Sequence, residues 1–215
     1  MKTYVVIGLG RFGSAVARQL CSMDCEVLAM DMSSELVQSV SSDVTHAVVG
    51  DSRDKEVLKA LDIGDFDCAV VAIGDDLASS VLTVMNLKEL GVPYIVCKAH
   101  DDTHRRVLEK LGADRVVIPE KEHAVRIARS LASTNVLDYI ELSEEYGIIE
   151  VPAPDSWQGK SLIDLQVRAK LGVNIIAIRH AGKIMVSPSA HYVINTGDVM
   201  VVVGDNKALE KVQKL

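Results

Sequence analysis

Three glycines near the start of the chain have the spacing G-x-G-x-x-G, within the segment GLGRFG at residues 8–13. This spacing is typical of a loop that holds the pyrophosphate of a dinucleotide. Gly8 would permit a tight turn, Gly10 would let the backbone approach the phosphates, and Gly13 would let helix and strand pack closely. The N-terminus of the following helix would attract phosphate through its N–H groups and dipole. The motif predicts a phosphate-binding loop, and the alternative is a glycine turn with no ligand.

An acidic residue follows at the distance that such a site requires. Asp31 lies 18 residues beyond Gly13, at the end of the apolar segment 26–31. A carboxylate there can accept hydrogen bonds from ribose hydroxyls, and it disfavours a 2′-phosphate. This context makes the ligand-free turn the less favoured interpretation and NADP an unfavoured ligand.

Further polar residues are expected around the same loop. Arg11 lies between the second and third glycines, where its guanidinium would bind terminal phosphates in a bidentate manner unless it is an ordinary solvated arginine. Asp51 follows another apolar segment and would either meet an adenine edge or cap the next helix. Gly74 and Asp75 come near the end of the segment 68–76 and would line the same crevice.

Redox chemistry would require a group that handles a proton beside the substrate. The candidates are His46, Tyr94, Lys98, His100, His104 and His123. His100 and His104 are four residues apart and neighbour two aspartates, so a metal site is conceivable, but a solvated helix start is favoured because no recognised ligand motif is present. The cofactor loop is therefore present without an obvious catalytic group, and we expect no enzyme activity.

Short apolar segments alternate with helical patterns through the first 120 residues. The segments 3–8, 26–31, 46–51, 68–76, 94–99 and 115–120 read as strands, and the first, a continuous β-branched run, reads as a strand buried on both faces. Such alternation predicts an α/β fold with a doubly wound, Rossmann-like parallel sheet, because right-handed crossovers place helices on both faces.

The pattern changes near residue 140. After a helical stretch at 122–133, the segment 135–147 reads as a polar crossover. Beyond it we expect short strands at 148–154, 174–180, 183–187 and 198–205, a helical turn at 161–165 and a last helix at 206–215. These elements predict a small α+β C-terminal domain, so the expected domains are 1–140 and 141–215.

Composition narrows the class of protein further. The formal net charge is −7, which disfavours broad electrostatic binding to nucleic acid. The four cysteines form no C-x-x-C pair, as expected for free thiols in a reducing cytoplasm. No apolar run approaches the roughly 18 residues of a membrane span. We therefore expect a cytoplasmic protein.

Several motifs together resemble one family. They are GLGRFG with Asp31, VVGDSRD at 48–54, AIGDD at 72–76, EKLGADRVVIPE at 109–120 and the small C-terminal module. This combination is similar to RCK proteins (regulators of potassium conductance), in particular the cytosolic gating subunits of Ktr-type bacterial potassium transporters. The resemblance spans essentially the whole chain and divides it into TrkA-N-like and TrkA-C-like (RCK_C) domains. It implies a nucleotide-sensing regulatory subunit that assembles from dimers into an octameric ring, peripheral to a membrane potassium-translocating subunit.

The same resemblance implies a set of nucleotide-binding residues. ATP and ADP would compete for one site, with phosphates on the glycine loop, the ribose on Asp31 and the adenine near Asp51 and Ser52. Arg11 would reach the terminal phosphate, including across a dimer interface. Glu120 would hold a cation such as Mg²⁺ near the γ-phosphate, although from the residues alone it is an ordinary N-terminal helix acid. The full predicted set is Gly8, Gly10, Arg11, Phe12, Gly13, Asp31, Met32, Asp51, Ser52, Ala72, Ile73, Gly74, Lys98 and Glu120.

A second ligand, cyclic di-AMP, is implied at the C-terminal domain. The matching positions are Arg168, Asn174, Ile175, Ile176 and Pro188. An arginine would pair with phosphate and the aliphatic side chains would pack on purine faces, whereas the alternative is a dimer interface without ligand. Two other functions stay open: an NAD-dependent oxidoreductase, and an NAD(H)-responsive redox regulator of the Trk type. A DNA-binding NAD sensor is disfavoured by charge and by the lack of a recognition-helix motif.

Overall fold

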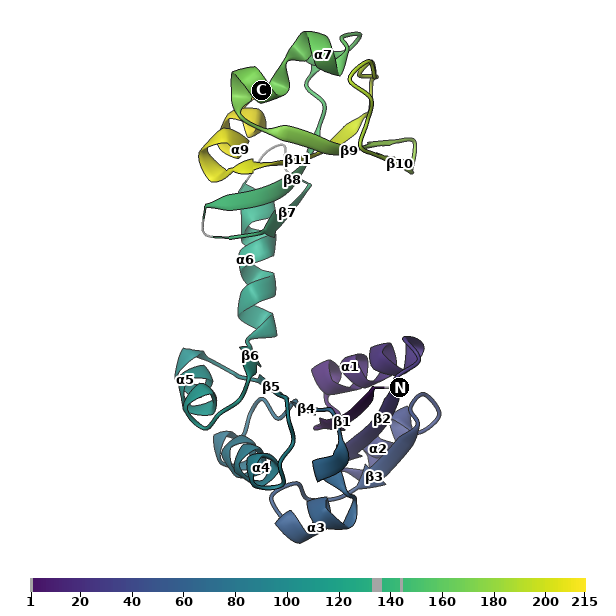
Figure 1. Cartoon of the computed structure of the whole chain (residues 1–215), viewed down its shortest axis with the longest axis vertical. Coiled ribbons are helices and arrows are strands. Elements are labelled where there is room, and N and C mark those ends of the chain that lie inside the picture. The colour runs from purple at the N-terminus through teal and green to yellow at the C-terminus, as the bar shows by residue number, and fades with distance from the viewer. Residues whose placement is uncertain (1, 133–136, 144) are drawn as a thin grey trace. The chain divides into compact units, whose positions relative to one another are not determined.

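The computed structural model describes residues 2–132, 137–143 and 145–215, which form two compact units, Met1–Pro119 and Glu120–Leu215 (Figure 1). The division falls before the expected domain boundary at residue 140. One reason is that strand β7 (Asp138–Glu141) pairs with a strand of the second unit.

The N-terminal unit contains a six-stranded parallel sheet in the order β3-β2-β1-β4-β5-β6. Its strands are β1 (Thr3–Ile7), β2 (Glu26–Asp31), β3 (His46–Val49), β4 (Cys68–Val71), β5 (Ile95–Lys98) and β6 (Arg115–Val117). Between them lie α1 (Arg11–Ser22), α2 (Ser34–Val40), α3 (Lys55–Ala60), the 3₁₀ turn η1 (Ile63–Asp65), α4 (Leu77–Glu89) and α5 (Asp102–Lys110). The predicted doubly wound parallel sheet is confirmed.

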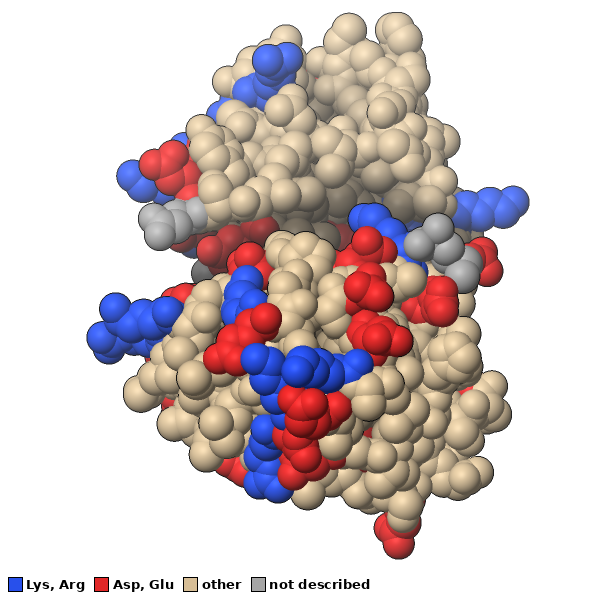
Figure 2. Space-filling view, turned by 60° about the horizontal axis from the view of Figure 1, so that its bottom comes forward, with Lys and Arg blue, Asp and Glu red and all other residues tan. Residues whose placement is uncertain are grey.

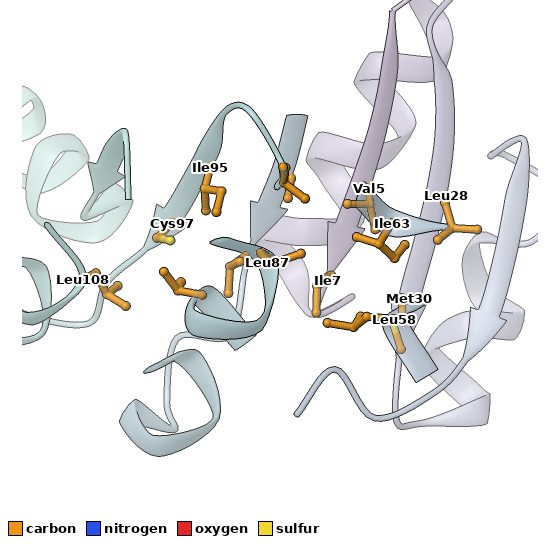
Figure 3. Close-up of a cluster of buried hydrophobic side chains, with 14 of the residues drawn as sticks. Val5, Ile7, Leu28, Met30, Leu58, Ile63, Leu87, Ile95, Cys97 and Leu108 are labelled. Atoms are coloured by element: carbon orange, nitrogen blue, oxygen red, sulfur yellow. The ribbon is translucent and has the colours of Figure 1, made fainter. Parts of the chain in front are cut away.

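Two apolar clusters flank this sheet because successive side chains of a strand point to opposite faces. On β1, Val5 and Ile7 belong to one cluster and Val6 belongs to the other. Figure 3 shows the first cluster, in which side chains from β1 and β2 pack with Leu58 and Ile63 at one end and with Leu87 of α4 toward the other. The central strands β1, β2 and β4 are largely buried on both faces, which explains why they read as continuous apolar runs, whereas the edge strands β3 and β6 are partly exposed.

The helices of this unit begin at defined caps. Ser33, Asp54, Asp76 and Asp101 each accept a hydrogen bond from a backbone N–H in the first turn of α2, α3, α4 and α5, respectively. Such caps satisfy N–H groups that have no partner inside the helix.

The C-terminal unit contains α6 (Pro119–Ala132, whose first residue lies in the other unit) and a five-stranded sheet in the order β10-β9-β11-β8-β7. Its pairings are antiparallel between β7 (Asp138–Glu141), β8 (Tyr146–Pro152), β9 (Asn174–His180), β10 (Lys183–Val186) and β11 (Val199–Asp205). Its other helices are η2 (Asp155–Trp157), α7 (Leu162–Leu165), α8 (Val167–Leu171) and α9 (Asn206–Gln213). The predicted small C-terminal domain is confirmed.

The prediction of a polar crossover at 135–147 is wrong for its described part, which forms β7. Tyr139 packs against the C-terminal core and covers Gly147, and its hydroxyl donates a hydrogen bond to Asn206 Oδ1 at 3.1 Å. One aromatic side chain thus anchors a strand whose first and last residues are acidic. Residues 133–136 and 144, on which the helix end and part of the crossover prediction fall, lie outside the described residues.

Charged side chains on the visible face of the N-terminal unit are interleaved by sign rather than gathered into one patch (Figure 2). Exposed ion pairs of this unit include Lys55–Glu89 and Lys59–Glu56. Within the described residues, no helix is long and apolar enough to cross a membrane. All four cysteines are free, and burial raises the pKa of Cys68 to about 11 and of Cys97 to about 12, which makes these two thiols poor nucleophiles.

A buried carboxylate organises one end of the C-terminal sheet. Asp198 is 1% exposed and accepts hydrogen bonds from the Tyr192 hydroxyl (3.0 Å) and the Asn195 N–H (2.9 Å), while His180 Nδ1 lies 2.7 Å from its Oδ1. Burial raises the pKa of the Tyr192 hydroxyl, and its hydrogen bond to the Asp198 carboxylate raises it further. Asp198 thereby holds the loop before β11 against the end of β9.

We expect Asp198→Ala to lower the free energy of unfolding of the C-terminal unit by about 2 kcal/mol, because the loop loses the buried carboxylate to which the half-buried Tyr192 and the exposed Asn195 donate hydrogen bonds. Trp157 is the single tryptophan of the chain and lies in this core, so its fluorescence during denaturation reports on this unit. The exposed Glu210→Ala substitution serves as control. A loss below about 1 kcal/mol would show that the carboxylate does not organise the loop.

Candidate nucleotide-binding site

A pocket of about 310 Å³ lies at the carboxyl ends of strands β1 to β4. This is the edge where open parallel sheets bind ligands. Nine residues of the predicted nucleotide-binding set line it: Gly8, Gly10, Asp31, Met32, Asp51, Ser52, Ala72, Ile73 and Gly74. The other lining residues are Ile7, Gly50, Arg53, Asp75, Asp76 and Ser79.

The three glycines of the loop differ in what requires them. Gly8 has φ +91°, a conformation that favours glycine. A Cβ on Gly13 would lie 1.8 Å from the carbonyl oxygen of Gly8, so only glycine lets α1 pack this closely on the turn. Gly10 has φ −63°, and a Cβ there would meet nothing within 4 Å. The protein itself therefore requires glycine at positions 8 and 13 but leaves open space beside Gly10.

Helix α1 begins at this open space without a side-chain cap. Gly10 occupies the cap position, and the first turn of α1 contains no acidic residue. By contrast, the N-terminus of α4 is occupied by the protein's own carboxylate. Asp76 accepts hydrogen bonds from Ser79 N–H (3.1 Å) and Ser79 Oγ (2.6 Å), and these bonds lower its pKa. Of the two helix starts beside the pocket, α1 is the one left available to an anion.

Asp31 fixes the loop from the end of β2. Its Oδ2 accepts a hydrogen bond from Leu9 N–H at 2.6 Å, and its Oδ1 accepts one from Ser33 N–H at 2.8 Å. A carboxylate can accept about four hydrogen bonds, so two acceptor positions stay open toward the pocket. Asp31 can therefore hold the glycine loop and still receive two hydroxyl donors.

Asp51 is used differently, through a neighbour that the sequence analysis does not single out. The Arg53 side chain binds both carboxylate oxygens of Asp51, with Nη2–Oδ2 at 2.7 Å and Nε–Oδ1 at 2.9 Å. The Arg53 N–H also donates to Oδ1 at 2.9 Å. Hydrogen bonds from Arg53 lower the pKa of Asp51 and keep it ionised. The only signal for Arg53 in the sequence is its position two residues after a strand-end acid.

Ser52 lines the pocket, and its side chain is buried against α4. Its Oγ lies 2.8 Å from Thr83 Oγ1 of α4. Asn86 Nδ2, one turn further along α4, donates to the carbonyl oxygens of Ser52 (3.2 Å) and Arg53 (2.9 Å). Helix α4 thus holds the loop after β3 in place.

Five predicted residues do not line the pocket. Gly13 acts through packing, and Arg11 and Phe12 lie on the first turn of α1 beside it. The Lys98 side chain lies against Gly74, where a Cβ would be 3.1 Å from Nζ. Glu120 lies in the first turn of α6 and in the other compact unit, so its proximity to this site stays a prediction.

The histidine pair at the start of α5 forms part of the fold. His104 is buried, and its Nδ1 accepts a hydrogen bond from the His100 N–H at 3.3 Å. Burial lowers the pKa of His104 and favours the neutral ring. Among the described residues, no group of three or more His, Cys, Asp or Glu is placed to hold a metal ion.

Comparison with known proteins shows what family these features belong to. The TrkA-N domain matches residues 4–119 and the TrkA-C domain matches residues 147–215. Ktr system potassium uptake protein C of Bacillus subtilis is 45% identical over 213 residues, covering 99% of this chain and 96% of that protein. Ktr system potassium uptake protein A of the same organism is 45% identical over 210 residues, covering 98% and 95%. The chain belongs to the Ktr potassium-uptake family. It is a regulatory RCK subunit of Ktr potassium transport.

Solved structures agree with the fold of a Ktr protein. The GsuK RCK domain matches 100% of this chain with a TM-score of 0.70, at 19% sequence identity. The Ktr chain spans 47% of the length of that structure. At this sequence identity the likeness supports the RCK architecture and does not identify a ligand.

The geometry of the loop predicts opposite outcomes for two alanine substitutions in this Ktr protein. Gly13→Ala should lower the free energy of unfolding of the N-terminal unit by about 3 kcal/mol or more, because the methyl group would overlap the Gly8 carbonyl. Gly10→Ala should change it by less than about 0.5 kcal/mol, since the position has ordinary backbone angles and open space.

Circular dichroism during thermal unfolding checks both variants, with Trp157 fluorescence as an internal control for the C-terminal unit. Equal destabilisation by the two substitutions would mean that the loop does not depend on the close approach at Gly13.

Proposed function

We propose that this Ktr subunit binds ATP and ADP in the pocket of its N-terminal unit and regulates a membrane potassium transporter according to which nucleotide is bound. The observation that carries the proposal is the start of α1, which has no side-chain cap and open space beside Gly10. Phosphates fit there because the helix N-terminus supplies N–H donors and positive potential. The two open acceptor positions of Asp31 suit the two ribose hydroxyls.

A regulator that distinguishes ATP from ADP must contact the γ-phosphate, because a ligand shifts a conformational equilibrium only by differential interaction. Arg11 is exposed in the first turn of α1, next to the proposed phosphate position. Its guanidinium suits bidentate phosphate binding. We assign Glu120 as ligand of a cation such as Mg²⁺, which prefers carboxylate and phosphate oxygens.

The proposed assembly is an octameric ring of dimers that contacts a membrane potassium-translocating subunit. Large apolar side chains exposed on single helices support association with further copies. Examples are Leu82 and Met85 on α4 (45% and 43% exposed) and Leu131 on α6 (82% exposed). Such side chains are commonly covered at interfaces between subunits.

Thermal unfolding with and without nucleotide tests the proposal directly. At about 100 times its dissociation constant, a ligand of the native state stabilises by roughly 2.7 kcal/mol, which raises the melting temperature by several degrees. We expect this rise with ATP and with ADP, each with Mg²⁺, and no rise for Gly10→Ala. Arg11→Ala should reduce the rise with ATP more than the rise with ADP.

NADH and NAD serve as comparison ligands, and Arg18→Ala serves as a control because its guanidinium pairs with Asp43 away from the pocket. A rise with NADH and none with ATP would contradict the proposal and favour a redox-responsive regulator.

We propose a second site for cyclic di-AMP in the C-terminal unit. A cavity of about 500 Å³ there is lined by three of the five predicted residues, Arg168, Asn174 and Ile175. Ile176, where the pairing of β9 with β11 is irregular, and Pro188 lie outside the lining. Arg168 supplies a phosphate-binding cation beside an apolar surface, as a dinucleotide requires.

Isothermal titration with cyclic di-AMP tests this second site. Arg168→Ala should weaken binding about tenfold or more, whereas Lys170→Ala, the same loss of charge on the same helix outside the cavity lining, should not. Equal effects of the two substitutions would indicate only a general electrostatic attraction.

A further inference from the structure

The ion pair between Asp51 and Arg53 determines which of these two side chains the wall of the nucleotide pocket offers to a ligand. Four contacts reach the two carboxylate oxygens of Asp51: Oδ1 faces the Arg53 N–H and Nε, and Oδ2 faces Nη2 and Nε. Three N–H groups of Arg53 thus take most of the roughly four acceptor positions of the carboxylate, since the single Nε–H is shared between both oxygens. An adenine amino group that donates a hydrogen bond to Asp51, as predicted, would have to compete with Arg53 for it.

What the pocket receives instead is the guanidinium of Arg53. Its Nη2 lies 3.8 Å from Met32 Sδ, so the side chains after β2 and β3 meet at one wall of the pocket. Met32 is 60% exposed, and the Arg53 side chain is 40% exposed. Both therefore have surface available to a ligand, although the guanidinium is already held in position by Asp51.

A planar guanidinium and a polarisable thioether have one ligand chemistry in common. Both pack favourably against the face of a flat aromatic ring. The phosphate end of the pocket is at Gly10 and the ribose end is at Asp31, so the chain position after Asp31 and the loop after β3 border the remaining part of the ligand. For a nucleotide, that part is the base.

We propose that Met32 and Arg53 form a stacking surface for the purine base, with Asp51 as the residue that positions Arg53. This inference rests on the proposed binding of adenine nucleotides and adds the residues that recognise the base. The charge of Arg53 is already paired with Asp51. Arg53 is therefore better suited to stacking on a base than to binding a phosphate. The contact would be the same for ATP and ADP.

Binding of ATP, ADP and inorganic tripolyphosphate by the whole protein tests the proposal, because tripolyphosphate carries the phosphates without a base. We expect Arg53→Ala to weaken ATP and ADP equally, by about 3- to 30-fold, and to leave tripolyphosphate unchanged. Met32→Ala should have the same pattern. Arg53→Lys should not restore affinity, because it keeps the charge and loses the plane.

Asp51→Asn measures the positioning role. It should weaken ATP in the wild-type background and add little in the Arg53→Ala background, since both substitutions remove the same held guanidinium. Arg18→Ala is the matched control: its pair with Asp43 has a similar exposure, with side chains 45% and 42% exposed, and lies outside the pocket lining. Unfolding without ligand verifies that each variant folds.

The outcomes separate this inference from the proposed function. A loss of tripolyphosphate binding in Arg53→Ala, or full rescue by lysine, would make Arg53 a phosphate ligand and overturn the stacking surface while leaving the nucleotide site. Additive effects of Asp51→Asn would overturn the positioning role. If the wild type binds NADH and not ATP, the proposed function fails, and the same variants tested with NADH, which also carries adenine, decide the stacking surface. Failure to bind any of these nucleotides would overturn both.

Discussion

The close approach of Gly13 to the Gly8 carbonyl is the constraint on which the nucleotide pocket depends. Because no side chain separates them, α1 starts directly at the end of β1 and directs its first N–H groups toward the carboxyl edge of the sheet. The Asp31 carboxylate then fixes the intervening turn through Leu9 N–H. The position of the proposed phosphate-binding surface thus follows from backbone packing in the core, with no contribution from a long side chain.

Three of the four aspartates that line the pocket have different roles, which their hydrogen bonds reveal. Asp76 satisfies the start of α4, Asp51 is occupied by Arg53, and Asp31 retains acceptor capacity. In a pocket this acidic, a polyanionic ligand requires that negative charge be neutralised or turned away from the phosphates. Capping at Asp76 and pairing at Asp51 do this, while the uncapped α1 provides the positive end.

Local patterns were sufficient to predict the parallel sheet, the C-terminal module and five of the nine residues of the predicted set that line the pocket, and the family resemblance added Met32, Ser52, Ala72 and Ile73. They work because strands buried on both faces read as apolar runs and because the glycine loop has a fixed spacing. They failed at β7, where one packed aromatic residue, Tyr139, outweighs acidic neighbours. They also missed Arg53, because pairing between Asp51 and Arg53 depends on side-chain geometry that α4 supports through Asn86, more than thirty residues away in sequence. Such tertiary contacts leave no periodic signal.

The proposed contacts fall into two groups with different consequences for regulation. Ribose and base contacts, at Asp31 and at the surface formed by Met32 and Arg53, are identical for ATP and ADP, so they set affinity without favouring either state. Discrimination between ATP and ADP must come from groups that reach the γ-phosphate, and Arg11 in the first turn of α1 is the candidate. An exposed arginine loses side-chain entropy when it orders around a phosphate. In the proposed site, the contact with the γ-phosphate offsets this cost, and ADP does not offer that contact. Strengthening the base contact would therefore lower the concentration at which the protein responds, while the ratio of ATP to ADP that switches it would stay the same.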